Sequence, residues 1–304
     1  MLNRQFGKNE TRIIVNYKNL KGLIDVISFR FLTRFDCSSN SITGIKNIDK
    51  CVYLSYLDCS YNLFDFLDIL TPRLNYLNCS HNKIKSIERL PQSLNTLICS
   101  YNQLSNLDCL PENLTSLDCS FNKIIQLSNL PYRLKTLICS NCSISNLDNL
   151  PTSLIFLDCS NNIITSIDYL PSSLNTLDCS YNHINNFNDL PNQIKTLNIS
   201  NNKNNLPEQI IQHIPKSVEE FILEHRILKK NNIDFKKWVC KNNYKNSYVK
   251  CVVSKDKINK NISTFSPTEY ESENDDVDLF EEINNYYDDD EYYFDYFRYY
   301  RYGY

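Results

Sequence analysis

Alanine is absent from this chain of 304 residues, and glycine occurs only four times. Alanine is the strongest helix former, so its absence argues against a helix-rich enzyme. The glycines lie far apart, at positions 7, 22, 44 and 303, whereas a phosphate-binding loop needs several of them close together. The composition therefore argues against most nucleotide-binding α/β enzymes.

Long apolar runs are missing as well. Nowhere do about 18 apolar residues follow one another, so we expect no membrane-spanning helix and no membrane partner. Residues 1–10 are polar and lack the apolar stretch of a secretory signal. Thirteen cysteines without such a signal favour reduced thiols, and we expect an intracellular, cytoplasmic protein.

Charge is distributed unevenly along the chain. Residues 1–202 hold 17 basic and 16 acidic side chains, residues 203–265 hold 13 and 6, and residues 266–304 hold 2 and 13. A nearly neutral body has no general positive field, which argues against nucleic acid as a partner. Because residues 266–304 combine many like charges with few aliphatic side chains, they predict a disordered acidic-aromatic tail.

A repeat of 20 residues occupies most of the chain. Its pattern is L-x-x-L-x-C-S-x-N-x-I-x-x-L-x-x-L-P-x-x. Regular copies begin at Leu74, Leu94, Leu114, Leu134, Leu154 and Leu174, and looser copies begin at Leu32, Leu54 and Ile194. Residues 32–213 thus hold about nine regular units, after an N-terminal cap with a degenerate repeat at 1–31. Stacked repeats need atypical ends to cover their core.

Each copy begins with a short alternating segment, in which Leu77 and Cys79 alternate with the residues around them. This period of two predicts a strand. One strand in each unit has no partner within that unit, so the units must stack into a parallel sheet. The proline after the last leucine, such as Pro91, disfavours a helix on the return path. We therefore predict a repeat solenoid with a parallel β-sheet on its concave face and a mostly extended, helix-poor convex side.

This pattern resembles the leucine-rich repeat family over residues 10–228. The 20-residue length and the Leu-Pro step are similar to the short repeats of bacterial effector proteins. The resemblance implies a right-handed horseshoe or superhelix whose concave sheet binds a protein partner. The composition, rich in Asn, Ile, Lys and Tyr without alanine, is similar to that of leucine-rich repeat proteins of giant DNA viruses of amoebae (mimivirus-like), which would place the protein in the host cytoplasm.

Cysteine fills one column of the repeat. The column contains Cys37, Cys59, Cys79, Cys99, Cys119, Cys139, Cys159 and Cys179, and Ile199 completes it. Isoleucine in the same slot indicates an apolar site, where free cysteine packs readily. Cys139 and Cys142 form a C-x-x-C pair, but Cys142 occupies the slot of the repeat asparagine and no second pair accompanies it. We therefore expect no metal site and no cofactor.

Outward-facing rows carry the candidate partner site. An acidic or polar row precedes the cysteine column, and an aromatic row follows a row of serines that we assign to the turn. The predicted partner-binding residues are Asp36, Asp58, Tyr61, Asn78, His81, Tyr101, Asp118, Phe121, Asp158, Asp178 and Tyr181. Stacked aspartates repel unless a cationic partner or solvent compensates, and aromatic side chains dominate many interfaces. A solvated face that drifted with repeat duplication is the alternative. We expect Lys83, Gln103 and Lys123 on the convex side.

Residues 214–265 predict a degenerate last repeat and a basic C-terminal cap, with short strands at 235–240 and 248–253. Related effectors can carry a ubiquitin-ligase domain with a nucleophilic cysteine, but the sequences around Cys240 and Cys251 do not resemble its Cys-x-Asp motif. We expect a non-catalytic protein-binding module with no small-molecule substrate. An effector-type E3 ubiquitin ligase and a structural virion component are the alternatives.

Overall fold

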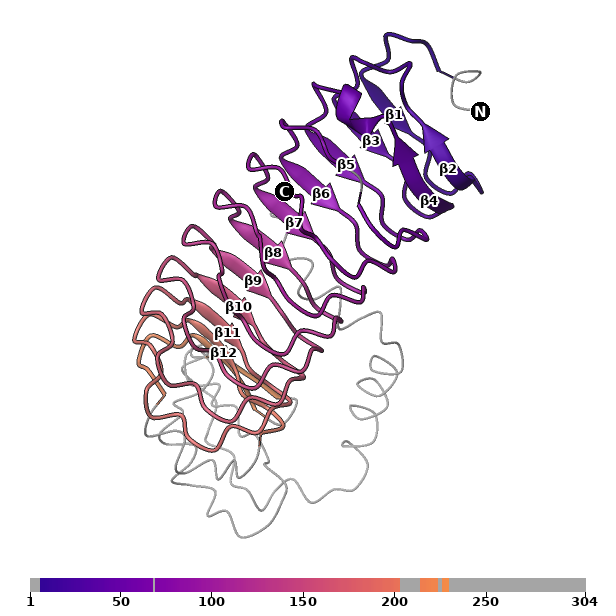
Figure 1. Cartoon of the computed structure of the whole chain (residues 1–304). Coiled ribbons are helices and arrows are strands. Elements are labelled where there is room, and N and C mark those ends of the chain that lie inside the picture. The colour runs from indigo at the N-terminus through magenta and orange to yellow at the C-terminus, as the bar shows by residue number, and fades with distance from the viewer. Residues whose placement is uncertain (1–5, 68, 203–213, 224–225, 230–304) are drawn as a thin grey trace, which may run out of the picture. The chain divides into compact units, whose positions relative to one another are not determined.

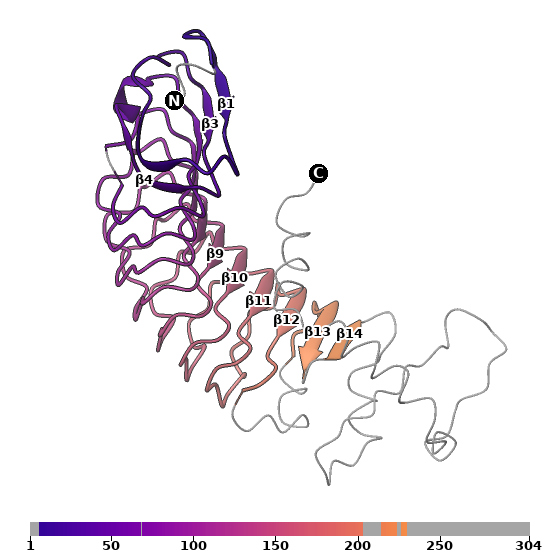
Figure 2. The same cartoon turned by 90° about the vertical axis from the view of Figure 1, so that its right-hand side faces the viewer.

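One short strand per repeat builds the main sheet of the protein (Figure 1). The computed structural model describes residues 6–67, 69–202, 214–223 and 226–229. The main sheet comprises β1 (Arg12–Ile14), β3 (Arg34–Asp36), β5 (Tyr56–Asp58), β6 (Tyr76–Asn78), β7 (Thr96–Ile98), β8 (Ser116–Asp118), β9 (Thr136–Ile138), β10 (Phe156–Asp158), β11 (Thr176–Asp178), β12 (Thr196–Asn198), β13 (Glu220–Leu223) and β14 (Arg226–Lys229), in that order. Figure 2 shows the strands on the inner, concave side of the curved solenoid.

Strand pairing keeps the repeat in register. Leu77 lies opposite Leu57 on one side and opposite Leu97 on the other, so equivalent residues form straight columns across the sheet. From β1 to β13 the pairs are parallel, and β14 then returns antiparallel to β13. The predicted parallel-sheet solenoid is confirmed.

The core is a set of such columns. Leu74, Leu77, Cys79 and Ile84 of one unit are fully buried, because the strand turns every second side chain inward and the return path adds further apolar residues. Their equivalents in the neighbouring units are buried in the same way. The cysteine column lies entirely inside this core, and burial raises the pKa of the Cys79 thiol to about 12.

The convex side of the regular units is extended and helix-poor, as the sequence predicts. Proline opens a tight turn there, and the Leu94 amide donates to the Pro91 carbonyl at 3.0 Å. Among the described residues the helical assignments are limited to a short 3-10 turn, η2 (Ile48–Lys50). The same residues include no helix long and apolar enough to cross a membrane.

The first two units depart from this pattern. Their return paths pair as a second, two-stranded parallel sheet of β2 (Lys21–Asp25) and β4 (Ser41–Lys46), which the sequence analysis did not predict. Leu23 is 51% exposed, unlike the buried leucines of the regular units. The pairing shifts between Gly22 and Leu23, which turns Leu23 outward.

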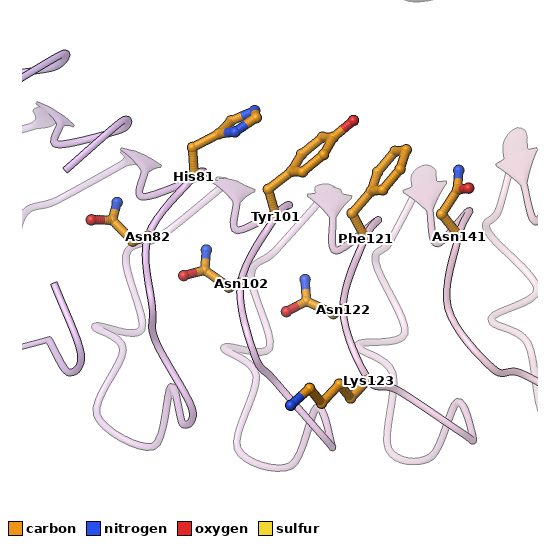
Figure 3. Close-up of a pocket in the computed structure, with 8 residues that line it drawn as sticks. All are labelled: His81, Asn82, Tyr101, Asn102, Phe121, Asn122, Lys123 and Asn141. Atoms are coloured by element: carbon orange, nitrogen blue, oxygen red, sulfur yellow. The ribbon is translucent and has the colours of Figure 1, made fainter. Parts of the chain in front are cut away.

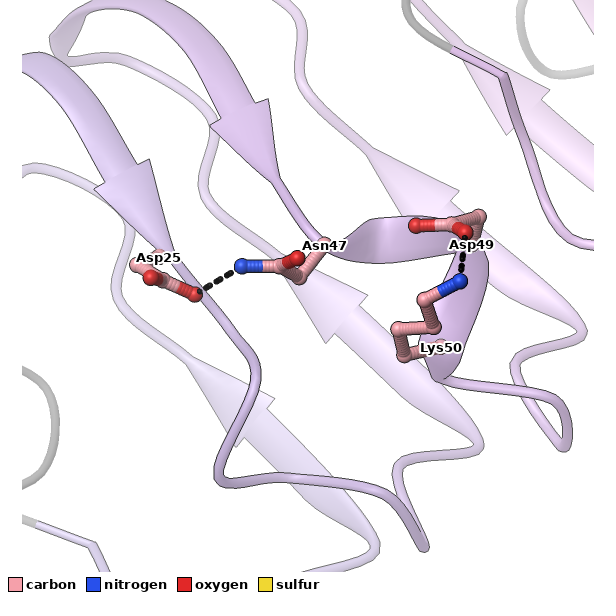
Figure 4. Close-up of polar contacts among 4 residues, drawn as sticks. All are labelled: Asp25, Asn47, Asp49 and Lys50. Carbon is pink, nitrogen blue, oxygen red and sulfur yellow. Dashed lines mark hydrogen bonds and ion pairs between the residues drawn. The ribbon is translucent and has the colours of Figure 1, made fainter.

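Polar contacts join these two return paths beside η2 (Figure 4). The Asn47 amide donates to Asp25 Oδ1 at 2.9 Å, and this hydrogen bond is the main reason that the pKa of Asp25 is lowered. Lys50 pairs with Asp49 at 2.8 Å.

At the other end, the buried Val218 and Phe221 continue the repeat into β13. The strands predicted at 235–240 and 248–253, and the tail predicted at 266–304, lie outside the described residues.

Candidate functional site

In all but one of the regular units, an asparagine after the strand fixes the geometry of the turn beside the concave face. Asn82 Nδ2 donates to the carbonyls of Cys79 and Ser80 in its own unit and of Cys59 in the unit before, each at 3.1 Å. Its Oδ1 accepts from the Phe64 amide at 2.9 Å. One side chain therefore satisfies polar backbone groups of two neighbouring turns.

The residue before each asparagine consequently adopts a left-handed backbone conformation. The φ angles are 52° at Tyr61 and His81, and 53° at Tyr101 and Phe121. The same backbone angle in consecutive units points these side chains in one direction, as Figure 3 shows for His81, Tyr101 and Phe121.

Four rings in this column stack on one another. The centroids of Tyr61 and His81 are 3.9 Å apart, those of His81 and Tyr101 are 4.0 Å apart, and those of Tyr101 and Phe121 are 3.9 Å apart. We call these four residues the aromatic ladder. Asn141 and Asn161 follow in the same column, so Tyr181 is separated from the ladder by two units.

Left-handed angles make this an unusual column for aromatic side chains. Asparagine adopts the left-handed region more readily than residues with bulky side chains, and the structure places Asn141, Asn161 and Asn201 there. Ring stacking of about 0.5–1.5 kcal/mol per pair offsets part of the backbone cost in the ladder.

The acidic row stabilises the turns through hydrogen bonds, a role that was not predicted from the sequence. Asp58 Oδ1 accepts from the Ser60 amide at 3.0 Å and from the Ser60 hydroxyl at 2.6 Å. Asn78 makes the equivalent bonds to Ser80, so an amide oxygen serves the turn as well as a carboxylate does. This pairing places the serine row in the turn, which fits the assignment made from the sequence. The signal was available as the recurring Asp/Asn-Cys-Ser triplet.

Electrostatics within the row reflects burial and like charges. Burial raises the pKa of Asp58, and the neighbouring Asp36 charge raises it further. Burial raises the pKa of Asp158 to about 7, with a further contribution from Asp178. Burial lowers the pKa of His81, which favours the neutral imidazole inside the ladder.

A second group of rings lies on the strands themselves and was not among the predicted site residues. Tyr56 and Tyr76 stack with their centroids 4.4 Å apart, and the Arg34 guanidinium carbon lies 3.6 Å from the Tyr56 centroid. Arg34 Nε is buried and has no hydrogen-bond partner within the described part of the chain. The sequence could have indicated this stack, because Tyr56 and Tyr76 lie 20 positions apart in the first outward slot of their strands.

An open depression of about 610 Å³ lies along the ladder (Figure 3). His81, Tyr101 and Phe121 line it together with Asn141 and the side chain of Lys123. Lys123, expected on the convex side, lines this depression because it follows Asn122 directly where the chain leaves the turn.

The structure thus brings together some of the predicted residues and separates others. Asp36, Asp58 and Asn78 are consecutive members of one row. Asp118 lies between Ile98 and Ile138 in that row. Asp158 and Asp178 form a second acidic pair farther along the sheet. In the residues described, no group of three His, Cys, Asp or Glu side chains could hold a metal ion.

This arrangement of parallel strands, buried leucine and cysteine columns and asparagine turns is the fold of leucine-rich repeat proteins. Among solved structures, the chain is similar to YopM from Yersinia enterocolitica WA-314, with 30% identity, a TM-score of 0.56, and coverage of 67% of this chain and 48% of that one. It is also similar to the functional domain of InlJ from Listeria monocytogenes, which includes a cysteine ladder, with 28% identity, a TM-score of 0.52, and coverage of 71% and 53%.

TLR13 in its complex with ssRNA13 shares the fold alone, with 20% identity, a TM-score of 0.57, and coverage of 72% of this chain and 36% of that one. The chain spans about half the length of the YopM and InlJ structures that it matches. No protein-family model and no curated protein matches the sequence.

Proposed function

We propose that the protein is a non-catalytic binding module that holds a protein partner on its concave face. The observation that carries this proposal is the aromatic ladder, which occupies left-handed positions where asparagine costs less free energy. The turns that follow the strands hold these rings, and the adjacent strands β3 and β5 end in Asp36 and Asp58. Large rings held on a rigid scaffold supply contact area at a low entropic cost.

Charge on this face favours a protein over a nucleic acid. The outward row of the sheet contains Asp36, Asp58, Asp118, Asp158 and Asp178. Asp118 and Asp178 are buried, whereas Asp36, Asp58 and Asp158 are partly exposed. Phosphate groups that approached the sheet would meet these three carboxylates, whereas nucleic-acid sites concentrate Lys and Arg.

The cysteines of the described core do not support catalysis. Burial raises the pKa of their thiols, as at Cys59 and Cys99, and a nucleophilic cysteine needs a lowered pKa and access to substrate. The ubiquitin-ligase alternative depends on Cys240 or Cys251, which lie outside the described residues. A reducible ubiquitin adduct that disappears in Cys240→Ala or Cys251→Ala would establish that alternative.

The virion alternative, the resemblance to proteins of giant viruses and a location in the cytoplasm stay predictions. The free thiols in the described residues suit a reducing compartment, which supports the intracellular assignment.

Affinity capture with the full chain tests the binding proposal. The test variant replaces all four ladder residues by asparagine, the residue that the same column uses at Asn141 and Asn161. Tyr169→Asn is a matched control, because Tyr169 lies on the convex return path, also has a left-handed φ of 68° and is 87% exposed. We expect specific proteins, identified by mass spectrometry, to be lost from the ladder variant and retained by the control. Equal capture by both variants would refute the proposal.

A further inference from the structure

We propose that the partner's contact segment is an extended arginine-containing peptide, with its guanidinium groups against Asp36 and Asp58 and its apolar atoms along the aromatic ladder. This inference rests on the proposed function and names the chemistry of the partner. Four observations support it: the dimensions of the ladder, the charge of the two aspartates, the contact of Arg34 with Tyr56, and the negative charge of the outward aspartate row.

The ladder has the length and form of a peptide track. Its three centroid steps of 3.9, 4.0 and 3.9 Å together span about 12 Å along the solenoid axis. An extended chain advances about 3.3 Å per residue, so about four residues fit along it. Because the rings stack face to face, their edges form the strip that meets a partner, and apolar side chains pack well on ring edges. The open depression follows the same line from His81 to Asn141 and also includes Lys123, so the arginine side chains are assigned to the opposite end of the ladder, at Asp36 and Asp58.

Asp36 and Asp58 supply the charge at the N-terminal end of this strip. They lie directly opposite each other on β3 and β5, and neither forms an ion pair with any of the described residues. One oxygen of each carboxylate accepts from its own serine, since Ser38 and Ser60 donate to the two Oδ1 atoms. Asp58 Oδ2 also accepts from Asn78 Nδ2 at 3.2 Å, a neutral partner that leaves the negative charge in place. Adjacent carboxylates of equal charge repel, and a cation placed between them relieves that repulsion.

Arg34 shows within the chain how this face holds a planar cation. Its guanidinium carbon lies 3.6 Å from the centroid of Tyr56, which in turn stacks on Tyr76. Arginine can stack on a ring and donate to carboxylates through a fixed fork of N–H groups, whereas lysine offers only a compact point charge. A face that combines rings with aspartates therefore favours arginine over lysine.

Single-stranded RNA is the macromolecule that the row disfavours. Bases could stack on aromatic side chains, but the phosphates that accompany them would lie beside Asp36 and Asp58. The negative charge of the aspartate row therefore favours a basic peptide and disfavours RNA. Binding of each can be measured directly.

The experiment measures fluorescence anisotropy with the full chain and four labelled probes. The probes are an alternating arginine-leucine peptide of eight residues, the same peptide with lysine, the same peptide with glutamate, and a single-stranded RNA octamer. We expect the arginine peptide to bind most tightly, the lysine peptide several-fold more weakly, and the glutamate peptide and the RNA not measurably. Affinity for the arginine peptide should fall as salt rises.

The matched variant is the double substitution of Asp36→Asn and Asp58→Asn. An amide keeps the hydrogen bonds to the serine, as Asn78 does with Ser80. The substitution gives up only the bond that Asp58 Oδ2 accepts from Asn78 Nδ2 at 3.2 Å, so the fold should be kept while both charges are removed. We expect the affinity for the arginine peptide to fall at least about tenfold, which corresponds to about 1.4 kcal/mol. Asp168→Asn, an exposed aspartate on the return path, should leave the affinity unchanged.

Two outcomes would overturn the inference. One is equal binding of the arginine and glutamate peptides or tighter binding of the RNA, and the other is an unchanged affinity in the double variant. If the ladder variant nevertheless loses its captured proteins, the proposed function stands and only the chemistry assigned to the partner is wrong. If capture does not depend on the ladder, the proposed function itself fails.

Discussion

The asparagine that follows most strands forms four side-chain hydrogen bonds, as Asn122 shows. Asn122 donates to Cys99, Cys119 and Ser120 and accepts from the Leu104 amide, all at 2.9–3.1 Å. Only one of the regular units replaces it, with Cys142, whose sulfur lies 3.6 Å from the Cys119 carbonyl. A thiol is a weak donor and acceptor, so this turn is held less firmly than its neighbours.

Restoring the repeat asparagine should therefore stabilise the protein. We expect Cys142→Asn to raise the free energy of unfolding by about 1–2 kcal/mol, because it adds hydrogen bonds to buried backbone groups. Denaturation in urea measures the change. The converse substitution, Asn122→Cys, should lower the stability by a similar amount. A Cys142→Asn variant less stable than the wild type would mean that the cavity of this turn is shaped for sulfur.

At the scale of the element, the strands could be predicted because one short pattern recurs every 20 residues. The fixed spacing of Leu57, Leu77 and Leu97 determines which residues pair, so strand position and register followed from the sequence. The β2–β4 pairing could not be found in this way. It depends on a shift beside Gly22, and the degenerate first unit gives no repeat register from which to infer it.

The candidate site could be predicted only in part: its residues followed from the repeat, but their contacts did not. The aromatic residues of the ladder recur in one slot, but their stacking depends on the left-handed turn angle, which the asparagine hydrogen bonds impose. The contact of Arg34 with Tyr56 joins units of different spacing, and no pattern within a unit indicates it.

The stability of the ladder can be separated from its binding role by one pair of substitutions. Tyr101→Asn removes the backbone cost of a left-handed aromatic residue, which is about 1 kcal/mol. It also removes two ring stacks, each of which contributes about 0.5–1.5 kcal/mol. Tyr169→Asn relieves a residue in the same left-handed region, with a φ of 68° and a side chain that is 87% exposed. We expect the free energy of unfolding to stay level or fall by up to about 2 kcal/mol in the first variant, and to rise by about 1 kcal/mol in the second.

Thermal and urea denaturation of the two variants provide the measurement. The difference between them reports the contribution of the stacked rings, because both substitutions replace a left-handed tyrosine by asparagine. If both variants gain equal stability, the stacking of His81, Tyr101 and Phe121 contributes nothing to folding, and its persistence would then require a role in binding.

At the scale of the whole molecule, stacking of units brings like charges together in a way that no single unit contains. Asp158 and Asp178 lie opposite each other on paired strands, and Asp118 is close enough to add to their interaction. Each carboxylate serves its own turn through Ser160 or Ser180. The repulsion is therefore a property of the assembled solenoid rather than of the repeat.

This repulsion predicts an unusual dependence of stability on pH. Burial and the Asp178 charge raise the pKa of Asp158 to about 7 in the folded protein, whereas an unfolded aspartate has a pKa of about 3.9. Between these values the folded state binds more protons than the unfolded state, so stability falls as pH rises from about 5 to about 7. We expect the thermal midpoint to be higher at pH 5 than at pH 8. Asp158→Asn keeps the oxygen that accepts from Ser160, so it should flatten this dependence and exceed the wild type at pH 8.

Asp168→Asn is the control, since an exposed carboxyl on the return path should leave the profile of the wild type intact. A thermal midpoint that instead rises from pH 5 to pH 8, and falls in Asp158→Asn at pH 8, would contradict the prediction. It would mean that cationic groups already compensate Asp158 and Asp178 in the folded protein. The uncompensated negative charge that could attract a basic partner would then be limited to the N-terminal pair of Asp36 and Asp58, where the aromatic ladder begins.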